Sequence, residues 1–443
     1  MQNKVVILGA GESGVGAAIL AKKQNFDVFV SDFSEIKGHY KDDLLKNDIA
    51  FEEKQHSEGI ILQANEIIKS PGIPDTVSIL QKAKAKNIPV VSEIEFAARY
   101  TKAKMICITG SNGKTTTTIL TYEIFKNAGL SVGLAGNVGE SFAKQVAYDD
   151  FEYYILELSS FQLDNMYDFK ADTAVLLNIT PDHMDRYDNN FLKYVESKLK
   201  ITQNQTQNDY FIYNTDDEAI TTNINKNMKA KKYPFSIKVD VEQGAYLEDE
   251  KIAFNTNETY FEIMAKDISL VGKHNIYNSM AAALAAKVNH IKDPIIRKTL
   301  STFKGVEHRL ELFQTIRGIK FINDSKATNV NSVWYALEAI ETPIVLIMGG
   351  TDKGNDYTII KKLIRTKVKA IVALGVDNTK IQQNFKDIVP IIESKSMDNA
   401  VLEAYKLADE GETVLLSPAC ASFDLFENYI DRGQKFKEAV RKL

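Results

Sequence analysis

Residues 108–120, ITGSNGKTTTTIL, place a lysine and a hydroxyl directly after two glycines. The apolar run MICIT leads into this segment and apolar residues at helical spacing follow it, which predicts a strand, a tight loop and a helix. Such a loop directs backbone N–H groups toward one point, where the charge of Lys114 also attracts phosphate. The Thr115 hydroxyl is placed to bind the Mg²⁺ of a nucleotide. We therefore predict a nucleotide-phosphate site.

The loop is shorter than the common phosphate loop. The pattern G-x-x-x-x-G-K-[ST] requires glycine at position 108, where this chain has Ile. An ordinary glycine-containing turn is the alternative interpretation. Glu157 favours the phosphate site, because it ends the apolar run YYIL and a carboxylate at the end of a neighbouring strand suits a metal ion opposite Thr115. The alternative for Glu157 is a solvated charge at a strand end.

A cluster of ionisable residues follows the next apolar run, TAVLLNIT, and is a second candidate site. Its members are Asp182, His183, Asp185 and Arg186. The helical segment after them carries three lysines whose pattern alone predicts solvated side chains. These are Lys193, Lys198 and Lys200. Further on, Asn275 and Asn278 lie near the start of an Ala-rich helix, where asparagine commonly caps.

The N-terminus holds a second glycine motif. Gly9, Gly11 and Gly14 fit G-x-G-x-x-G between a short apolar run and a helical segment, and Asp32 ends the next strand, where an acid that binds ribose or base belongs. The motif shows only that a diphosphate or nucleotide can approach the backbone, so NAD remains an alternative ligand. Gly72, in a Pro-Gly turn, permits another close approach.

Four strand-like runs alternate with helical segments after residue 305, which predicts a further parallel sheet with its working residues on the loops after the strands. Gly305 resembles a hinge before this part, beside His308 and Arg309. Polar residues occupy the predicted loops: Asp324, Lys326, Thr328, Lys353, Ser417 and Ser422.

The length and composition of the chain exclude several classes of protein. The chain has 443 residues, which suits about two to four domains. Its formal net charge of −5 gives no general attraction for nucleic acid. No apolar run reaches about 18 residues, and no signal peptide is recognised, so we predict a cytoplasmic protein without a membrane partner. Two cysteines, Cys107 and Cys420, are too few for a disulfide framework or a Cys-rich zinc site.

Taken together, these segments resemble the Mur ligases of peptidoglycan synthesis. The resemblance covers nearly the full chain and is carried, in order, by ITGSNGKTTT, LELSSFQL, NITPDHMDRY, the lysine of ESKLKI, GKHNIYNSMAA, GVEHRLE, NDSKATN, MGGTDKG and LLSPACASFDLFENYIDRGQKF. Folylpolyglutamate synthases share the short phosphate loop. The segment SPACASFDLF, followed by Arg432 and Gly433, resembles the branch that adds D-glutamate.

The resemblance implies an α/β protein of three domains. These are an N-terminal Rossmann-like domain that binds the UDP substrate (residues 1–93), a central P-loop ATPase-like domain that binds ATP (94–303) and a C-terminal Rossmann-like domain that binds the amino acid (304–443). The implied activity joins D-glutamate to UDP-N-acetylmuramoyl-L-alanine through an acyl phosphate, at the cost of ATP. The expected partners are these small molecules, and a monomer is expected.

The resemblance also implies two Mg²⁺ ions and a CO₂-derived carbamate on Lys198. Carbamylation turns the lysine into an anionic oxygen ligand and requires a neutral amine first. Thr115 and Glu157 would hold one ion, and His183 and carbamylated Lys198 the second. The implied catalytic residues are Lys114, Glu157, His183, Lys198 and Lys326. The implied ATP-binding residues are Gly110, Ser111, Asn112, Gly113, Lys114, Thr115, Thr116, Asn278 at the adenine, Arg309 and Asp324.

For the UDP substrate the resemblance implies the backbone of Glu12, Ser13, Gly14 and Val15, then Asp32 and Gly72 near uracil and ribose, with Asn137 and His183 at the acyl part. For D-glutamate it implies Thr328, Lys353, Ser422, Phe423 and Tyr429, and donors of this kind suit carboxylates. Glu12 departs from the family, which commonly has a neutral residue there, because an acid beside a diphosphate is unfavourable unless it points away.

Two alternatives stay open from the sequence. One is another member of the same superfamily that adds a different amino acid, against which the SPACAS segment argues. The other is a nucleotide-binding sensor without ligase activity, in which loss of His183 or Lys198 would change nothing.

Overall fold

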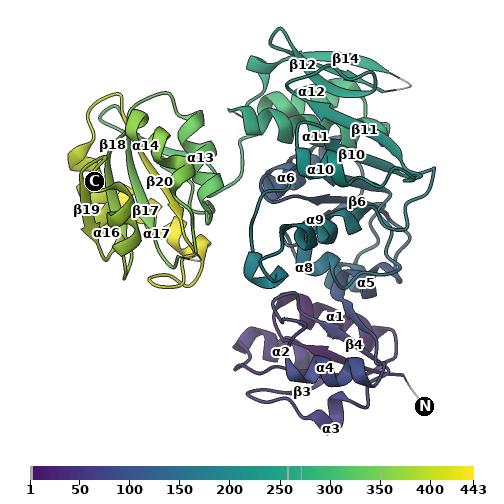
Figure 1. Cartoon of the computed structure of the whole chain (residues 1–443). Coiled ribbons are helices and arrows are strands. Elements are labelled where there is room, and N and C mark those ends of the chain that lie inside the picture. Colours follow the sequence, from purple (N-terminus) through teal and green to yellow (C-terminus); the bar gives the residue numbers. More distant parts are fainter. Residues whose placement is uncertain (1–2, 257–258, 271, 353) are drawn as a thin grey trace. The chain divides into compact units, whose positions relative to one another are not determined.

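The computed structural model describes residues 3–256, 259–270, 272–352 and 354–443. The chain divides into two compact units, the first of Met1–Ile268 with Tyr277–Thr302 and the second of Ser269–Ile276 with Phe303–Leu443. Three β-sheets organise these units, two in the first and one in the second (Figure 1). The predicted α/β fold, with a largely parallel sheet in the N-terminal, central and C-terminal parts of the chain, is thereby confirmed.

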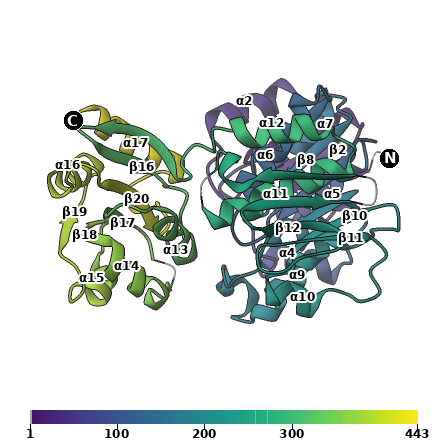
Figure 2. The same ribbon diagram turned by 90° about the horizontal axis from the view of Figure 1, so that it is seen from above.

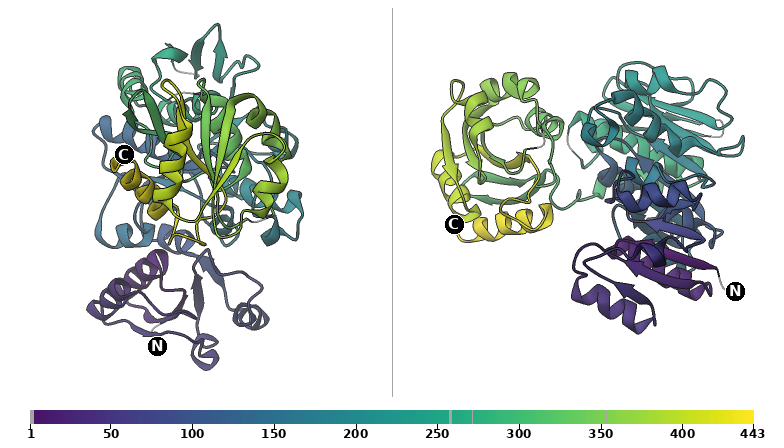
Figure 3. Two further views of the ribbon diagram at one scale, coloured as in Figure 1. Left: turned by 90° about the vertical axis from the view of Figure 1, so that its left-hand side faces the viewer. Right: turned by 60° about the horizontal axis from the view of Figure 1, so that its bottom comes forward.

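The N-terminal sheet is parallel, with its strands in the order β3-β2-β1-β4-β5. Alternate residues of β1 face opposite layers: Val5 and Ile7 lie in a core with α1 and α5, while Val6 and Leu8 lie in one with α4. Helices therefore cover both faces (Figure 3). The elements are β1 (Lys4–Leu8), α1 (Glu12–Lys23), β2 (Asp27–Ser31), α2 (Gly38–Lys46), β3 (Ala50–Glu52), α3 (Glu58–Ile61), β4 (Glu66–Lys69), α4 (Ser78–Ala85), β5 (Val90–Ser92) and α5 (Glu93–Ala98).

The central sheet has the order β14-β13-β12-β11-β10-β9-β6-β8-β7, and β12, β13 and β14 pair antiparallel at one edge while the other neighbours are parallel. Its strands are β6 (Lys104–Thr109), β7 (Val132–Gly136), β8 (Tyr153–Glu157), β9 (Thr173–Leu176), β10 (Tyr210–Asn214), β11 (Lys231–Ser236), β12 (Gly244–Glu248), β13 (Lys251–Asn255) and β14 (Tyr260–Met264). The helices are α6 (Lys114–Asn127), α7 (Phe142–Tyr148), α8 (Ser160–Leu163), α9 (Phe191–Leu199), α10 (Glu218–Asn223), α11 (Lys273–Val288) and α12 (Asp293–Thr302).

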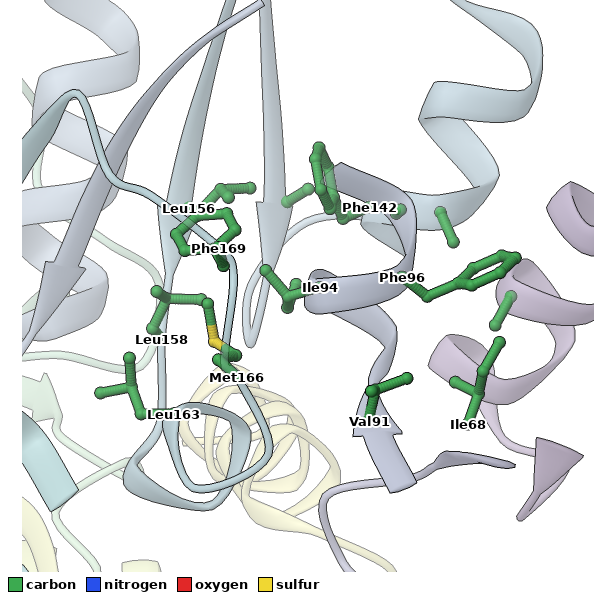
Figure 4. Close-up of a cluster of buried hydrophobic side chains, with 14 of the residues drawn as sticks. Ile68, Val91, Ile94, Phe96, Phe142, Leu156, Leu158, Leu163, Met166 and Phe169 are labelled. Carbon is green, nitrogen blue, oxygen red and sulfur yellow. The ribbon is translucent and has the colours of Figure 1, made fainter. Parts of the chain in front are cut away.

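One continuous apolar core joins the N-terminal and central sheets within the first unit. Figure 4 shows Ile68 and Val91 of the N-terminal sheet and Phe96 of α5 in the same cluster as Phe142 of α7 and Leu156 of β8. All five side chains are at most 3% exposed. Burying such side chains stabilises by about 1.5–3 kcal/mol each, so this shared core contributes to the stability of the first unit.

Glu93 lies inside this junction at the start of α5 and is 3% exposed. Its Oε1 accepts hydrogen bonds from the Ser141 hydroxyl and, at 2.9 Å, from the Ala143 N–H at the start of α7. Burial, with a smaller contribution from the charge of Glu12, raises the pKa of Glu93 from 4.5 to about 7. The folded protein therefore favours the protonated acid near neutral pH.

We expect Glu93→Gln to make the protein more heat-stable than the parent at pH 8 and to change little at pH 5. A pKa raised in the folded state adds stability below the unfolded pKa of 4.5, and this is lost as the pH rises through about 7. At pH 8 the free energy of unfolding of Glu93→Gln should exceed that of the parent by at most about 3 kcal/mol. Melting temperatures at both pH values measure it, with exposed Glu35→Gln as the control. An equal shift at pH 5 and pH 8 would contradict the titration of Glu93.

The second unit contains one sheet, in the order β15-β16-β20-β17-β18-β19, in which only the pair β15–β16 among the described strands is antiparallel. Helices α13 and α14 cover one face of this sheet and α16 and α17 the other, so the two pairs lie apart in Figure 2. The elements are β15 (Glu311–Ile316), β16 (Ile319–Asn323), α13 (Val330–Ala339), β17 (Ile344–Gly349), α14 (Lys361–Lys367), β18 (Val368–Leu374), α15 (Thr379–Phe385), β19 (Ile391–Ser394), α16 (Met397–Leu407), β20 (Thr413–Ala419) and α17 (Tyr429–Arg441).

The described helices include none that is long and apolar enough to cross a membrane.

Candidate active site

The predicted phosphate loop connects buried β6 to α6. Gly113 caps the helix with φ +81°, and a Cβ at this position would meet the Asn278 Oδ1 at 2.3 Å. Both facts require glycine. Asn278 is 4% exposed and its Oδ1 accepts the Thr117 hydroxyl at 3.2 Å. The residue implied at the adenine thus lies against the loop and the first turn of α6.

Asn178 fixes the shape of the loop and was not predicted as a site residue. Its Oδ1 accepts the Asn112 N–H at 2.8 Å, its Nδ2 donates to the Asn112 carbonyl at 3.0 Å, and its own carbonyl accepts the Ser111 N–H at 2.9 Å. The Ser111 hydroxyl donates to the Thr180 carbonyl at 2.8 Å. The segment after β9 therefore holds the loop. Its position directly after a buried strand is the signal that could have identified Asn178.

Lys114 and Thr115 open α6. The Lys114 ammonium donates to the carbonyls of Gly110 at 2.8 Å and Ser111 at 2.9 Å, so its charge lies over the loop. Thr115 and Thr116, which follow Lys114 in the first turn of α6, are buried, with 2% and 6% of their surfaces exposed.

Lys198 of α9 is buried against the same loop. The prediction of a solvated side chain from the sequence pattern alone is therefore wrong for this lysine. It is 1% exposed, and its Nζ donates to the Gly110 carbonyl at 2.8 Å and lies 4.6 Å from the centre of the Tyr194 ring. Burial, and next the charge of Lys114, hold the pKa of Lys198 well below its usual range. The low pKa favours the neutral amine, the form that carbamylation requires. The charged residues Lys193 and Lys200 instead pair with Asp188 and Asp164.

Glu157 ends β8 next to the loop strand, because it lies opposite Ile108 in the parallel register of β6 and β8. It is 1% exposed, and its Oε1 accepts the Asn137 amide at 3.0 Å. The alternative interpretation of Glu157, a solvated charge at a strand end, is therefore wrong. Its charge also acts on Lys198, together with those of Asp182 and Asp164.

His183 precedes the short 3-10 helix η1 (Met184–Tyr187), with φ +54°. Its ring meets Phe161 edge-on at 5.1 Å between ring centres, and its Nε2 lies 3.8 Å from the Asp182 carboxylate. Arg186 stacks on the same Phe161 ring at 4.5 Å and reaches the Gly72 carbonyl at 3.4 Å. The ionisable cluster thus contacts α8, which follows Glu157, and the predicted turn of the N-terminal sheet.

The oxygen-rich side chains around the loop fit Mg²⁺. A hydroxyl at Thr115 and a buried carboxylate at Glu157 are hard ligands, and a carbamate on Lys198 would add a further anionic oxygen. Asp182, whose charge acts on the Lys198 amine, supplies additional negative charge there.

The glycine motif of the N-terminal sheet is held by Asp32. One carboxylate oxygen accepts the Ala10 N–H and the other the Ser34 N–H, both at 2.7 Å. A Cβ at Gly14 would meet the Gly9 carbonyl at 1.8 Å, which explains that glycine. Asp32 therefore lies at the predicted end of the sheet, where it fastens the loop.

The C-terminal candidates gather where β16 and β20 end. Asp324 accepts the Ser417 hydroxyl at 2.8 Å and the Leu310 N–H at 3.2 Å, and burial raises its pKa to about 7. Lys326 lies 4.9 Å from the Tyr429 ring, at the start of α17. Thr328 is half-buried, Ser422 is buried and Phe423 is 70% exposed. Lys353 lies outside the described residues, and Arg309 is half-buried with its charge acting on Asp324.

Arg432 ties these C-terminal loops together and was assigned no role from the sequence. The side chain is 2% exposed. Its guanidinium donates to the Ser325 hydroxyl at 3.0 Å, the Ser325 carbonyl at 2.7 Å and the Cys420 carbonyl at 3.1 Å. One side chain of α17 therefore joins the loop after β16 to the loop after β20. The RG pair after SPACASFDLF was the available signal.

These features define an α/β protein with a shortened phosphate loop and a buried lysine that contacts it. Three family models match the chain: the Mur ligase MurD-like N-terminal domain over residues 3–92, the Mur ligase middle domain over 108–286 and the Mur ligase glutamate ligase domain over 308–420. The chain belongs to the Mur ligase family.

Curated relatives match over nearly their full length. Those named UDP-N-acetylmuramoylalanine–D-glutamate ligase include one from Bacteroides thetaiotaomicron, 56% identical with 99% of this chain and 100% of the relative covered. Another, from Porphyromonas gingivalis, is 54% identical with 99% and 98% covered.

Solved structures share the fold. UDP-N-acetylmuramate-alanine ligase MurC from Thermotoga maritima has a TM-score of 0.61 at 18% identity, with 99% of both chains covered. MurF ligase from the same organism, in complex with ADP, has a TM-score of 0.62 at 16% identity, with 94% and 95% covered.

Proposed function

We propose that this protein uses ATP to join D-glutamate to UDP-N-acetylmuramoyl-L-alanine in peptidoglycan synthesis. The choice of substrates is supported by the name that these relatives share, and the match to this chain covers 98–100% of their lengths. The observation that carries the chemistry is Lys198, whose buried amine donates to the Gly110 carbonyl of the phosphate loop and whose pKa is held well below its usual range by burial and the charge of Lys114. A generic nucleotide sensor has no need for a lysine buried at that point.

In the proposed first step, the phosphate loop and Lys114 hold ATP while a carboxylate oxygen of the alanyl group attacks the γ-phosphorus. The bond from that phosphorus to the bridging oxygen of ADP breaks, which leaves ADP and an acyl phosphate. Little covalent work falls to the protein, so positioning and charge neutralisation dominate. Thr115 and Glu157 would hold one Mg²⁺ ion and His183 with a carbamate on Lys198 a second, and these ions would supply positive charge at the phosphate oxygens.

In the second step, the D-glutamate amine attacks the acyl carbon, the carbon–oxygen bond to phosphate breaks, and the nitrogen loses a proton. Thr328 and Lys353 would bind one D-glutamate carboxylate, and Ser422 with the backbone of Phe423 and Tyr429 the other. Lys326 would lie at the reacting phosphate. Arg309, Asp324 and Asn278 would contact the nucleotide. The UDP part would be bound by the backbone of residues 12–15, with Asp32 and Gly72, and the acyl part by Asn137 and His183.

A phosphate-release assay tests the proposal. Release is expected only when ATP, Mg²⁺, UDP-N-acetylmuramoyl-L-alanine and D-glutamate are all present, and omission of any one should abolish it. A panel of amino acids serves as the specificity control. Equal turnover with L-lysine or diaminopimelate would show that a different member of the family is present. ATP binding without any amide product would instead support the sensor.

A further inference from the structure

Ser141 lies between two carboxylates and a glycine at the junction of the N-terminal and central sheets. Its N–H donates to the Glu12 Oε1 at 3.3 Å, and its hydroxyl donates to the Glu93 Oε1. A Cβ at Gly16 of α1 would meet the Ser141 Oγ at 1.9 Å, so only glycine allows this approach. We call Glu12, Gly16, Glu93 and Ser141 the Ser141 joint.

Glu12 is the member of this joint that belongs to the glycine motif. It is the first residue of α1, directly after Gly11. Its second oxygen, Oε2, accepts the Tyr40 hydroxyl of α2 at 3.2 Å, and this neighbouring charge contributes, after burial, to raising the Tyr40 pKa. The Glu12 carboxylate is therefore held between α2 and the start of α7. Both of its carboxylate oxygens therefore have hydrogen-bond donors in other segments of the chain.

The other side of the joint leads to Glu157, the carboxylate proposed to hold Mg²⁺. Ser141 follows Asn137 by four residues, and in this loop Gly139 has φ +82°, with the Leu134 carbonyl 2.3 Å from where its Cβ would be. Asn137 donates from its N–H to the Glu157 carbonyl at 2.9 Å and from its Nδ2 to the Glu157 carboxylate at 3.0 Å. The loop of residues 137–141 is thus hydrogen-bonded to Glu157 at its first residue and to Glu12 at its last.

We propose that Glu12 is a positioning residue for the UDP-linked substrate, because its bond to the Ser141 N–H sets the glycine loop in register with the loop that carries Asn137. The inference rests on the proposed function, in which the first loop receives the diphosphate and the second the acyl part. A substrate bound at both loops is sensitive to the offset between them.

The role predicts opposite results for two substitutions. Glu12→Ala removes the acceptor, so the Michaelis constant for UDP-N-acetylmuramoyl-L-alanine should rise about tenfold, the change expected for one lost charge-assisted hydrogen bond. Glu12→Gln retains an oxygen acceptor and removes a negative charge near the diphosphate. Its Michaelis constant should equal or fall below that of the parent. In both variants kcat and the Michaelis constant for ATP should stay within about twofold.

Two further variants complete the experiment. Tyr40→Phe removes the second partner of Glu12 and keeps the Ser141 contact, and Asp42→Ala removes an exposed acid from the same helix, α2. Both should leave the Michaelis constants unchanged. Binding of the UDP substrate without ATP, measured by calorimetry, should follow the same order, and melting temperatures confirm that each variant is folded.

Specific results would overturn the inference. These are a parent-like or lower Michaelis constant in folded Glu12→Ala, a rise in Glu12→Gln equal to that in Glu12→Ala, or a Tyr40→Phe effect as large as that of Glu12→Ala. Failure of the parent protein itself to bind UDP-N-acetylmuramoyl-L-alanine would instead contradict the proposed function, so the two failures are distinguishable.

Discussion

Lys198→Ala is expected to lower kcat by about 10²- to 10³-fold, the range seen when one group that stabilises developing charge is removed. The amine of Lys198 is buried at the Gly110 carbonyl, and burial and Lys114 keep its pKa low. A neutral amine can add to CO₂ and release a proton, which gives an anionic oxygen ligand at the position of the amine, and a low pKa favours the neutral form that reacts. Steady-state phosphate release measures the loss.

Lys193→Ala is the matched control, because Lys193 lies on the same helix with its side chain 52% exposed and paired with Asp188. It should retain parent activity. Labelled ¹³C-bicarbonate should give a carbamate carbonyl signal in the parent and in Lys193→Ala, but not in Lys198→Ala. Parent-like turnover by the folded Lys198→Ala variant would refute the carbamate role.

Arg432→Met is expected to raise the Michaelis constant for D-glutamate at least about tenfold and to lower stability by about 3 kcal/mol. Three hydrogen bonds from the buried guanidinium hold Ser325 and the Cys420 carbonyl, and their loss leaves buried acceptors without donors. The Ser422 and Phe423 loop follows Cys420 directly. The Michaelis constant for the UDP substrate should not change, since its implied residues lie in the first unit.

Arg441→Met, in the last turn of the same helix and exposed, is the control and should match the parent in both measurements. Arg432→Lys retains the charge but not the forked donor geometry, so it should fold better than Arg432→Met while still binding D-glutamate weakly. Parent-like D-glutamate kinetics in folded Arg432→Lys would show that Arg432 serves stability alone.

The sequence predicts the local elements well because their signals are local. The run MICIT, the two glycines and Lys114 determine a strand, loop and helix without reference to the rest of the chain. The burial of Lys198 is different, since it depends on α9 lying against the loop through Tyr194 and Ser111, 83 residues apart in sequence. Periodicity alone predicts a solvated lysine there, and only the family resemblance predicts its role.

The missed residues share this long-range character. Asn178 acts on a loop 66 residues earlier, and Arg432 on Ser325, 107 residues earlier. A hydrogen bond between distant segments leaves no periodic trace in either one. Glu12 illustrates the opposite case: the sequence identifies an acid that must point away from a diphosphate, and the structure supplies the donors at Tyr40 and Ser141.

The most direct test of the proposed reaction traces the carboxylate oxygen atoms of the substrate into the products. UDP-N-acetylmuramoyl-L-alanine labelled with ¹⁸O in both alanyl carboxylate oxygens is incubated with ATP, Mg²⁺ and D-glutamate, and the released phosphate is analysed by mass spectrometry. Attack of the carboxylate on ATP, followed by displacement of phosphate by the amine, predicts one ¹⁸O atom in each phosphate and one in the amide product. Unlabelled phosphate, or release that does not require D-glutamate, would contradict the proposed ligase.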